Sequence, residues 1–322
     1  MLPVLSLIIL GAFFIRAGLA GLMPLFIWTW AIALVLSILN ALPRWSLRVR
    51  SAAIVAAGLS AAMLITEIGF RAARVPTLLE AAPDIKVVSG RTYFHDDPSL
   101  GFASTPDTKA KARKQFGGRT LYHVVYTIDS NGHRKTQGNP AGDTWLFVGC
   151  SFTFGEGLDD DQTLPSYFSQ DLGYRANVVN AAFHGYGAHQ MLHLLETNRI
   201  GGIHKPVRQV IYEAIDSHVR RSAGRASWDL AGPNYQIDGD SVRYAGNLHG
   251  PYFITLAHIA LKSDVFRYFL FRMYFDTSFD RRELEAYARI VQQSARLVRR
   301  KYDAGFTILL WDEDTESGRQ IL

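Results

Sequence analysis

The chain has 322 residues, of which 48% are hydrophobic and 20% are charged, and its formal net charge is +5 at pH 7. This length accommodates one sizeable domain and an additional region. No basic run alternates with aromatic residues on one predicted face, so we expect no nucleic-acid partner. Cys150 is the single cysteine, which excludes an intramolecular disulfide, and no cysteine and histidine cluster has zinc spacing. We therefore expect no metal and no cofactor.

Three apolar runs fill the N-terminal region: residues 1–15, residues 17–42, and residues 52–66 with an extension to Phe70. A helix needs roughly 20 apolar residues to cross ~30 Å of hydrocarbon. The second run is long enough, the third is adequate and the first is marginal. Residues 1–71 are thus predicted to form two to three transmembrane helices. A cleaved signal peptide is the alternative, but no lysine or arginine precedes Arg16 and more apolar sequence follows.

The orientation of the chain in a membrane follows from its arginines. Arg44, Arg48 and Arg50 lie between the second and third runs, and loops rich in arginine stay on the cytoplasmic side. Residues after Phe70 are then outside the cytoplasm. We expect a protein of the inner membrane that contacts the lipid bilayer and carries a soluble domain on the periplasmic, extracytoplasmic side.

The remainder of the chain divides into two regions. Residues 72–142 are polar and rich in turn signals, which favours a linker and a small β-rich extension with a strand at 121–128. Residues 143–322 alternate between strand and helix patterns, which predicts an α/β domain with a parallel sheet covered on both faces. Its predicted strands are 144–148, 178–180, 207–215 and 306–311, its helices 164–172, 188–196 and 281–302 (the last stopped by Gly305), and its hairpin 235–244.

Ser151 follows the first of these strands, in a turn that contains Gly149. Ligand sites in parallel sheets lie at the carboxyl ends of the strands. A serine there acts as a nucleophile when a base accepts its proton, and backbone N–H groups can bind the resulting oxyanion. The competing interpretation is a serine that merely caps a helix.

Two blocks of this region resemble those of the SGNH/GDSL hydrolase family. Residues 149–155, Gly-Cys-Ser-Phe-Thr-Phe-Gly, resemble its Gly-Asp-Ser-x-x-x-Gly block, with Cys150 in place of the aspartate. Residues 180–185 match its Asn-x-x-x-x-Gly block. The resemblance implies a three-layer, flavodoxin-like α/β domain, with Ser151 as the nucleophile and Gly185 as an oxyanion donor.

The other two blocks of that family match less well. Ser217 stands where the family has an oxyanion-binding asparagine, and its hydroxyl has a shorter reach, while Asp216 would oppose a developing negative charge. The Asp-x-x-His block that supplies the base is absent, because no histidine follows His258. Either the domain is C-terminally incomplete or the base has been lost or relocated. The bare sheet edge near residues 306–311 favours the incomplete domain.

Four histidines lie near the predicted strand ends or on the helix that follows. His184 and His218 border the second and third blocks, where structural or substrate-contacting roles are more common than that of the base. His189 and His193 are four residues apart on a predicted helix. A solvated helix face is favoured over a metal site for this pair, because no third ligand is close in the sequence.

A second resemblance links the chain to membrane-anchored bacterial members of the same superfamily. Glu67 and Arg71 are similar to the Glu-x-x-x-Arg pair at the end of their last span, and residues 128–134 are similar to a motif that precedes their serine block. The alternative for Glu67 and Arg71 is an ion pair that simply ends the helix.

These observations favour a membrane-anchored, extracytoplasmic esterase, acyl hydrolase or acyltransferase that works through an acyl-Ser151 intermediate. Acylated cell-envelope or exported polysaccharide is the substrate that the expected compartment offers. The alternative is a catalytically inactive relative that binds glycan or scaffolds an envelope assembly. The missing base leaves open whether the chain is an enzyme.

Overall fold

The computed structural model describes residues 27–29, 31–32, 35, 47–73, 84–87, 92–116, 119–203, 206–270 and 279–311. The chain forms two compact units, the first from residues 1–80 and 251–276 and the second from residues 81–250 and 277–322. The predicted span at residues 1–15 lies outside the described residues, as does most of the span at 17–42.

The first unit contains the helices α3 (Leu47–Ala72), α8 (Pro251–Ala260) and α9 (Asp264–Leu270). Among the described residues, α3 is the one helix long and apolar enough to cross a membrane, with a mean hydropathy of 1.5 over Ile54–Ala72. The third apolar run is therefore a helix. Arg48 and Arg50 belong to its first turn rather than to a loop, because leucine and arginine extend the helix beyond the apolar run.

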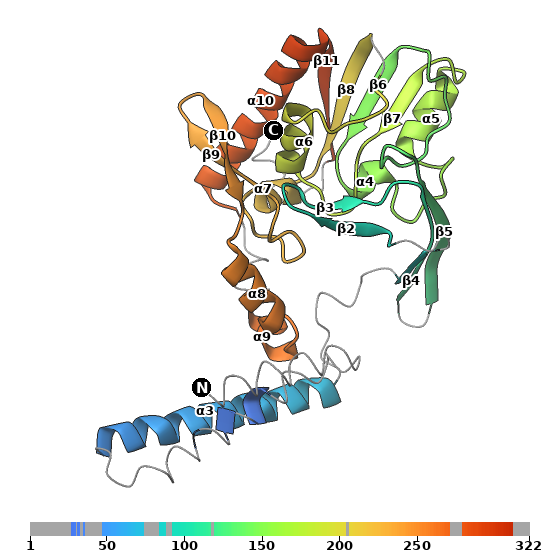
Figure 1. Ribbon diagram of the computed structural model, residues 1–322. Coiled ribbons are helices and arrows are strands. Elements are labelled where there is room, and N and C mark those ends of the chain that lie inside the picture. The colour runs from blue at the N-terminus through green and yellow to red at the C-terminus, as the bar shows by residue number, and fades with distance from the viewer. Residues whose placement is uncertain are drawn as a thin grey trace. The chain divides into compact units, whose positions relative to one another are not determined.

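The second unit is built around a four-stranded parallel sheet in the order β11-β8-β6-β7 (Figure 1). The alternation of strands and helices predicted such a sheet, and this coarse fold class is confirmed. Each strand lies within a residue or two of its predicted position: β6 (Thr144–Val148), β7 (Asn177–Asn180), β8 (Val207–Ala214) and β11 (Gly305–Leu310).

Helices cover both faces of this sheet. On one face, Phe168 of α5 (Leu164–Asp171) packs 4.9 Å from Trp145 and 5.3 Å from Phe147, measured between ring centroids. On the other face, Leu146 and Val210 share a core with the helices α6 (Ala188–Glu196), α7 (Ser217–Ser222) and α10 (Arg281–Tyr302). Each large apolar side chain buried in these cores contributes about 1.5–3 kcal/mol.

The helix α10 spans the predicted residues, but it does not end at Gly305. Its N-terminus is capped by Asp280, which accepts a hydrogen bond from the N–H of Glu283. At the other end Asp303 adopts the left-handed conformation with φ of 52°, and Gly305 already belongs to β11. Aspartate tolerates this conformation, so a stop at glycine was not required.

Short antiparallel strands complete the second unit. They precede or follow the strands of the parallel sheet along the chain, and some of them contact the loop that follows Ser151. They are β1 (Asp84–Val87), β4 (Thr108–Phe116) and β5 (Arg119–Ile128) in one sheet, β2 (Phe94–Asp97) with β3 (Gly101–Ser104), and β9 (Pro233–Asp238) with β10 (Ser241–Asn247).

Candidate active site

Ser151 is the first residue of α4 (Ser151–Phe154), a single turn of helix directly after β6, and it is partly exposed. Gly149 is required in the preceding turn, because a Cβ at this position would lie 2.3 Å from Oγ1 of Thr153. Cys150 between them is fully buried. The first N–H groups of a helix have no acceptor within it, so the backbone at Ser151 can donate to an anion.

Two side chains hold α4 against the neighbouring strands. Thr153 donates a hydrogen bond of 2.6 Å to Oε2 of Glu213, which lies near the carboxyl end of β8. Burial raises the pKa of Glu213. On the other side, the amide of Asn180, the last residue of β7, donates to the carbonyl of Thr153 at 3.0 Å. The orientation of the Ser151 turn is thus fixed from both adjacent strands.

Gly185 lies in the turn after β7, next in the sheet to the turn of Ser151. Its φ of 74° is left-handed, and a Cβ here would lie 2.6 Å from Nε1 of Trp228. That indole N–H donates to the carbonyl of Gly185 at 3.2 Å, and Arg221 donates to the carbonyl of Tyr186 at 2.7 Å. Trp228 and Arg221 therefore fix this turn. Neither residue was predicted to contact this turn, because residues 221–228 contain no recognisable motif.

Ser217 is the first residue of α7, shortly after β8, on the other side of β6. Its hydroxyl is buried and has no hydrogen-bond partner among the described residues. The strand order thus brings the turns of Ser151, Gly185 and Ser217 to one edge of the parallel sheet. Trp311, at the end of β11, reaches the same edge and packs 5.5 Å from the ring of Phe152.

His184 forms contacts through both ring nitrogens. Its Nδ1 lies 3.3 Å from Oε2 of Glu156, and its Nε2 lies 3.0 Å from the hydroxyl of Tyr93. The contact with His184 lowers the pKa of Glu156 to about 2, and burial lowers the pKa of His184 itself. The ring also packs 4.2 Å from that of Phe154. In this arrangement His184 is a structural residue rather than the base for Ser151.

His218 is also part of the core. Its side chain is fully buried, and Nδ1 lies 2.7 Å from the hydroxyl of Tyr212. Burial lowers the pKa of His218 well below its usual value, so the ring is neutral at pH 7. Throughout the described ranges, Ser151 has no hydrogen-bonded histidine.

The expectation of a solvated face for His189 and His193 is wrong, since both side chains are buried. Nε2 of His189 lies 2.8 Å from Asp229, and Nδ1 lies 3.3 Å from the hydroxyl of Ser222. His193 contacts the hydroxyl of Tyr235 at 3.4 Å. The helix α6 is packed between other elements, so its polar positions find partners in the core. No group of three or more potential metal ligands occurs within the described part of the chain.

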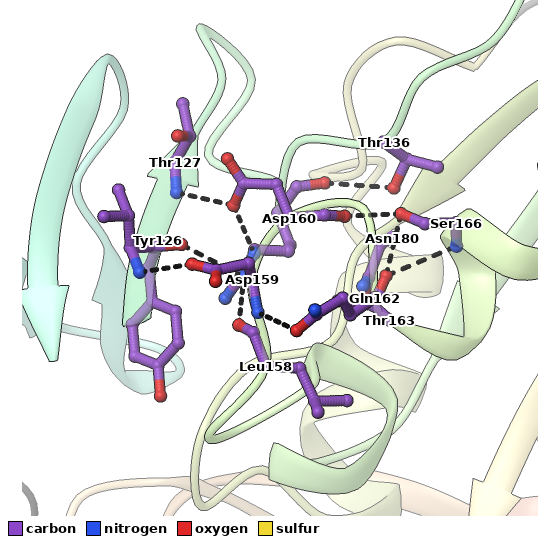
Figure 2. A network of polar contacts seen from close by, with 12 residues as sticks. Tyr126, Thr127, Thr136, Leu158, Asp159, Asp160, Gln162, Thr163, Ser166 and Asn180 are labelled. Atoms are coloured by element: carbon purple, nitrogen blue, oxygen red, sulfur yellow. Dashed lines mark hydrogen bonds and ion pairs between the residues drawn. The ribbon is translucent and has the colours of Figure 1, made fainter. Parts of the chain in front are cut away.

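The loop after α4 is attached to β5 by two carboxylates (Figure 2). Asp159 accepts from the N–H of Val125 at 2.8 Å, and Asp160 accepts from the N–H of Thr127 at 3.0 Å. The fully buried guanidinium of Arg134 lies 2.9 Å from Asp160 and donates to the carbonyl of Leu158 at 2.8 Å. Arg134 is the arginine of the motif recognised at residues 128–134. It stabilises the loop that continues from the serine block.

A surface hollow lined by Pro206, Arg208, Tyr302 and Asp303 lies near the start of β8, at the opposite end of the strand from Ser217. It has no connection with the predicted chemistry. Asp312, Glu313 and Asp314, which follow β11, lie outside the described residues.

Comparisons of the sequence with protein-family models and with curated proteins found no match. Membership of the SGNH family stays a prediction.

Proposed function

We propose that the protein is a membrane-anchored SGNH-like esterase, acyl hydrolase or acyltransferase with Ser151 as its nucleophile. The observation that carries this proposal is the position of Ser151 at a helix start, at the carboxyl edge of a parallel sheet, with Gly185 in the adjacent turn. Both turns are fixed by hydrogen bonds, and those at the Ser151 turn are buried. Such rigidity suits a site in which reacting atoms must be held in place.

In the proposed reaction, Oγ of Ser151 attacks the carbonyl carbon of an ester. The proton of the hydroxyl passes to a base, the ester's alcohol leaves with a proton, and an acyl-serine remains. Water or an acceptor hydroxyl then takes the acyl group and regenerates the serine. The N–H groups of Ser151 and Gly185 stabilise the oxyanion, with the unpartnered hydroxyl of Ser217 as a weaker donor. The base is a residue that the described contacts do not place beside Ser151.

The proposed anchor is α3. Its apolar window is 6% buried within the protein, as expected for a helix that faces lipid. With the arginines near its N-terminus on the cytoplasmic side, the second unit is extracytoplasmic. Acylated envelope or exported polysaccharide is the substrate class proposed for that compartment.

One observation favours a second candidate, a non-catalytic glycan-binding or scaffold protein. Within the described residues, each histidine at the edge of the site is either buried or engaged by other groups, and none is bonded to Ser151. A serine without a base is a weak nucleophile. A binding protein would keep the fixed turns and lose only the reactivity.

Reaction with a fluorophosphonate probe separates the two candidates. The full chain in detergent should be labelled, and the Ser151→Ala variant should not. Ser241→Ala, which removes a serine on the β9–β10 hairpin, is the matched control and should label like the unmodified protein. Equal labelling of the Ser151→Ala variant would refute the nucleophile. Absence of labelling in every form, with specific retention of an acylated glycan, would favour the binding protein.

A further inference from the structure

The helix α8 presents apolar side chains to its surroundings. Its ten residues include no lysine, arginine, aspartate or glutamate, and none of them is buried. Tyr252 is 88% exposed, Leu256 66% and Ile259 37%. The surface helix of a water-soluble domain normally has one polar face. An exposed apolar helix of this kind marks contact with a protein or a membrane.

A buried carboxylate joins this region to α3. The side chain of Glu67 is fully buried, and it accepts hydrogen bonds from Oγ of Ser263 at 2.6 Å and from the N–H groups of Asp264 and Val265 at 3.0 and 3.2 Å. Arg71 donates to the same carboxylate at 2.8 Å. Glu67 thus caps the N-terminus of α9, immediately after α8. The cap satisfies a charge that lipid would otherwise penalise.

The location of the cap identifies the partner of the apolar surface. Glu67 lies in the last turns of α3, so α9, which follows α8 in the chain, packs at the end of the helix that is long enough to span a membrane. Apolar side chains of α3 are also exposed, Leu59 by 64% and Ile65 by 69%. Exposed apolar side chains thus occur both on the candidate span and on α8, and both belong to one compact unit.

The aromatic content of the segment agrees with a position at the membrane surface. Tryptophan and tyrosine concentrate at the boundary between lipid and water, because their rings are partly polar and partly apolar. Phe269 is 51% exposed, Tyr268 packs edge-on against Phe70 of α3, and Phe266 stacks with Trp28. The rings thus cluster around the same end of α3.

We propose that residues 251–270 form a membrane-interface segment in which α8 lies in the headgroup region and inserts Tyr252, Leu256 and Ile259 among the lipid chains. Glu67 fixes the segment to the end of α3. The chain therefore returns to the bilayer at residue 251, after residues 81–250 of the second unit. This inference rests on the proposed membrane anchor, not on the chemistry of Ser151.

Depth-dependent quenching in liposomes tests the proposal. The full chain carries a single environment-sensitive fluorophore on a cysteine introduced in a Cys150→Ala background. The test positions are Leu256→Cys and, as a second variant, Tyr252→Cys. Leu59→Cys reports on α3, and Asp240→Cys, 98% exposed on the β9–β10 hairpin, reports on water. The quenchers are phosphatidylcholines with a doxyl group near the headgroup or near the chain end, and aqueous iodide.

We expect the headgroup-proximal doxyl lipid to quench both α8 labels several-fold more than the Asp240 label, and the deeper doxyl lipid to act most strongly at Leu59. Lipid quenching at Leu59 with iodide quenching at both α8 positions would overturn the interface segment and leave the anchor intact. Lipid quenching at neither α3 nor α8 would overturn both. Fluorophosphonate labelling of Ser151 is independent of these results.

Discussion

Arg134 offers a sharp test of how the loop after Ser151 is held. Its side chain is fully buried, lies 2.9 Å from Asp160 and donates to the carbonyl of Leu158. The guanidinium also stacks 4.4 Å from the ring centre of Tyr126 and 4.7 Å from that of Phe154. The Arg134→Met substitution keeps most of the aliphatic volume and removes the charge.

The expected loss follows from what remains after the substitution. Removing one partner of a buried ion pair costs about 3–5 kcal/mol. Asp160 is 29% exposed and keeps its bond to the N–H of Thr127, which places the loss at the lower end of that range. A loss of about 3 kcal/mol lowers the melting temperature of a unit of this size by roughly 6–12 °C.

Thermal unfolding of the full chain in detergent, followed by tryptophan fluorescence, measures this loss. The matched control is Arg289→Met on α10, because Arg289 bonds to Glu285 and Asp240, which are both exposed. Such surface pairs contribute little to stability, because water and salt screen them. If Arg134→Met destabilises the protein no more than Arg289→Met does, the buried guanidinium does not hold the loop and the reasoning is refuted.

Two further predictions concern the same edge of the sheet. Gly185→Ala is expected to cost about 1–3 kcal/mol in left-handed strain and additionally to displace Trp228, lowering probe labelling at Ser151. Gly239→Ala, left-handed with no neighbouring atom within 4 Å, is the control, and equal melting temperatures for the two variants would contradict the Trp228 contact. Glu156 has a pKa lowered from 4.5 to about 2, so its ionised form stabilises the fold above pH 4.5 and this contribution is lost as the pH falls towards 2. In acid unfolding, the stability of the Glu156→Gln variant should therefore lack this decrease between pH 4.5 and about 2. Identical pH profiles for the two proteins would show that Glu156 does not cause the decrease.

Local sequence patterns predicted the elements that surround the site. The apolar positions Leu284, Tyr287, Ile290 and Val298 lie on one helical face and gave α10 its correct bounds. Short apolar runs bounded by turn residues gave the four parallel strands. These patterns succeed because each strand or helix must bury one continuous surface.

The contacts between distant segments could not be predicted in this way. Thr153 bonds to Glu213, 60 residues later in the chain, and His189 bonds to Asp229, 40 residues later. A polar residue on a helix suggests a solvated face unless its partner is known, which is why α6 was misjudged. The Glu67–Arg71 pair was recognised from its spacing, but its bonds to Ser263 and Asp264 arise from an association that no local pattern indicates.

The contacts of the histidines around the sheet edge limit which residue can act as the base for Ser151. His184 is bonded to Glu156 and Tyr93, His189 to Asp229, and His218 is buried against Tyr212. Each of these rings stabilises the fold where it lies, so recruiting one as a base would break a buried contact at a cost of about 1–3 kcal/mol. A reactive Ser151 therefore needs a proton acceptor other than these three rings. The pH dependence of fluorophosphonate labelling then reports the pKa of that acceptor, and it should be unchanged by Glu156→Gln.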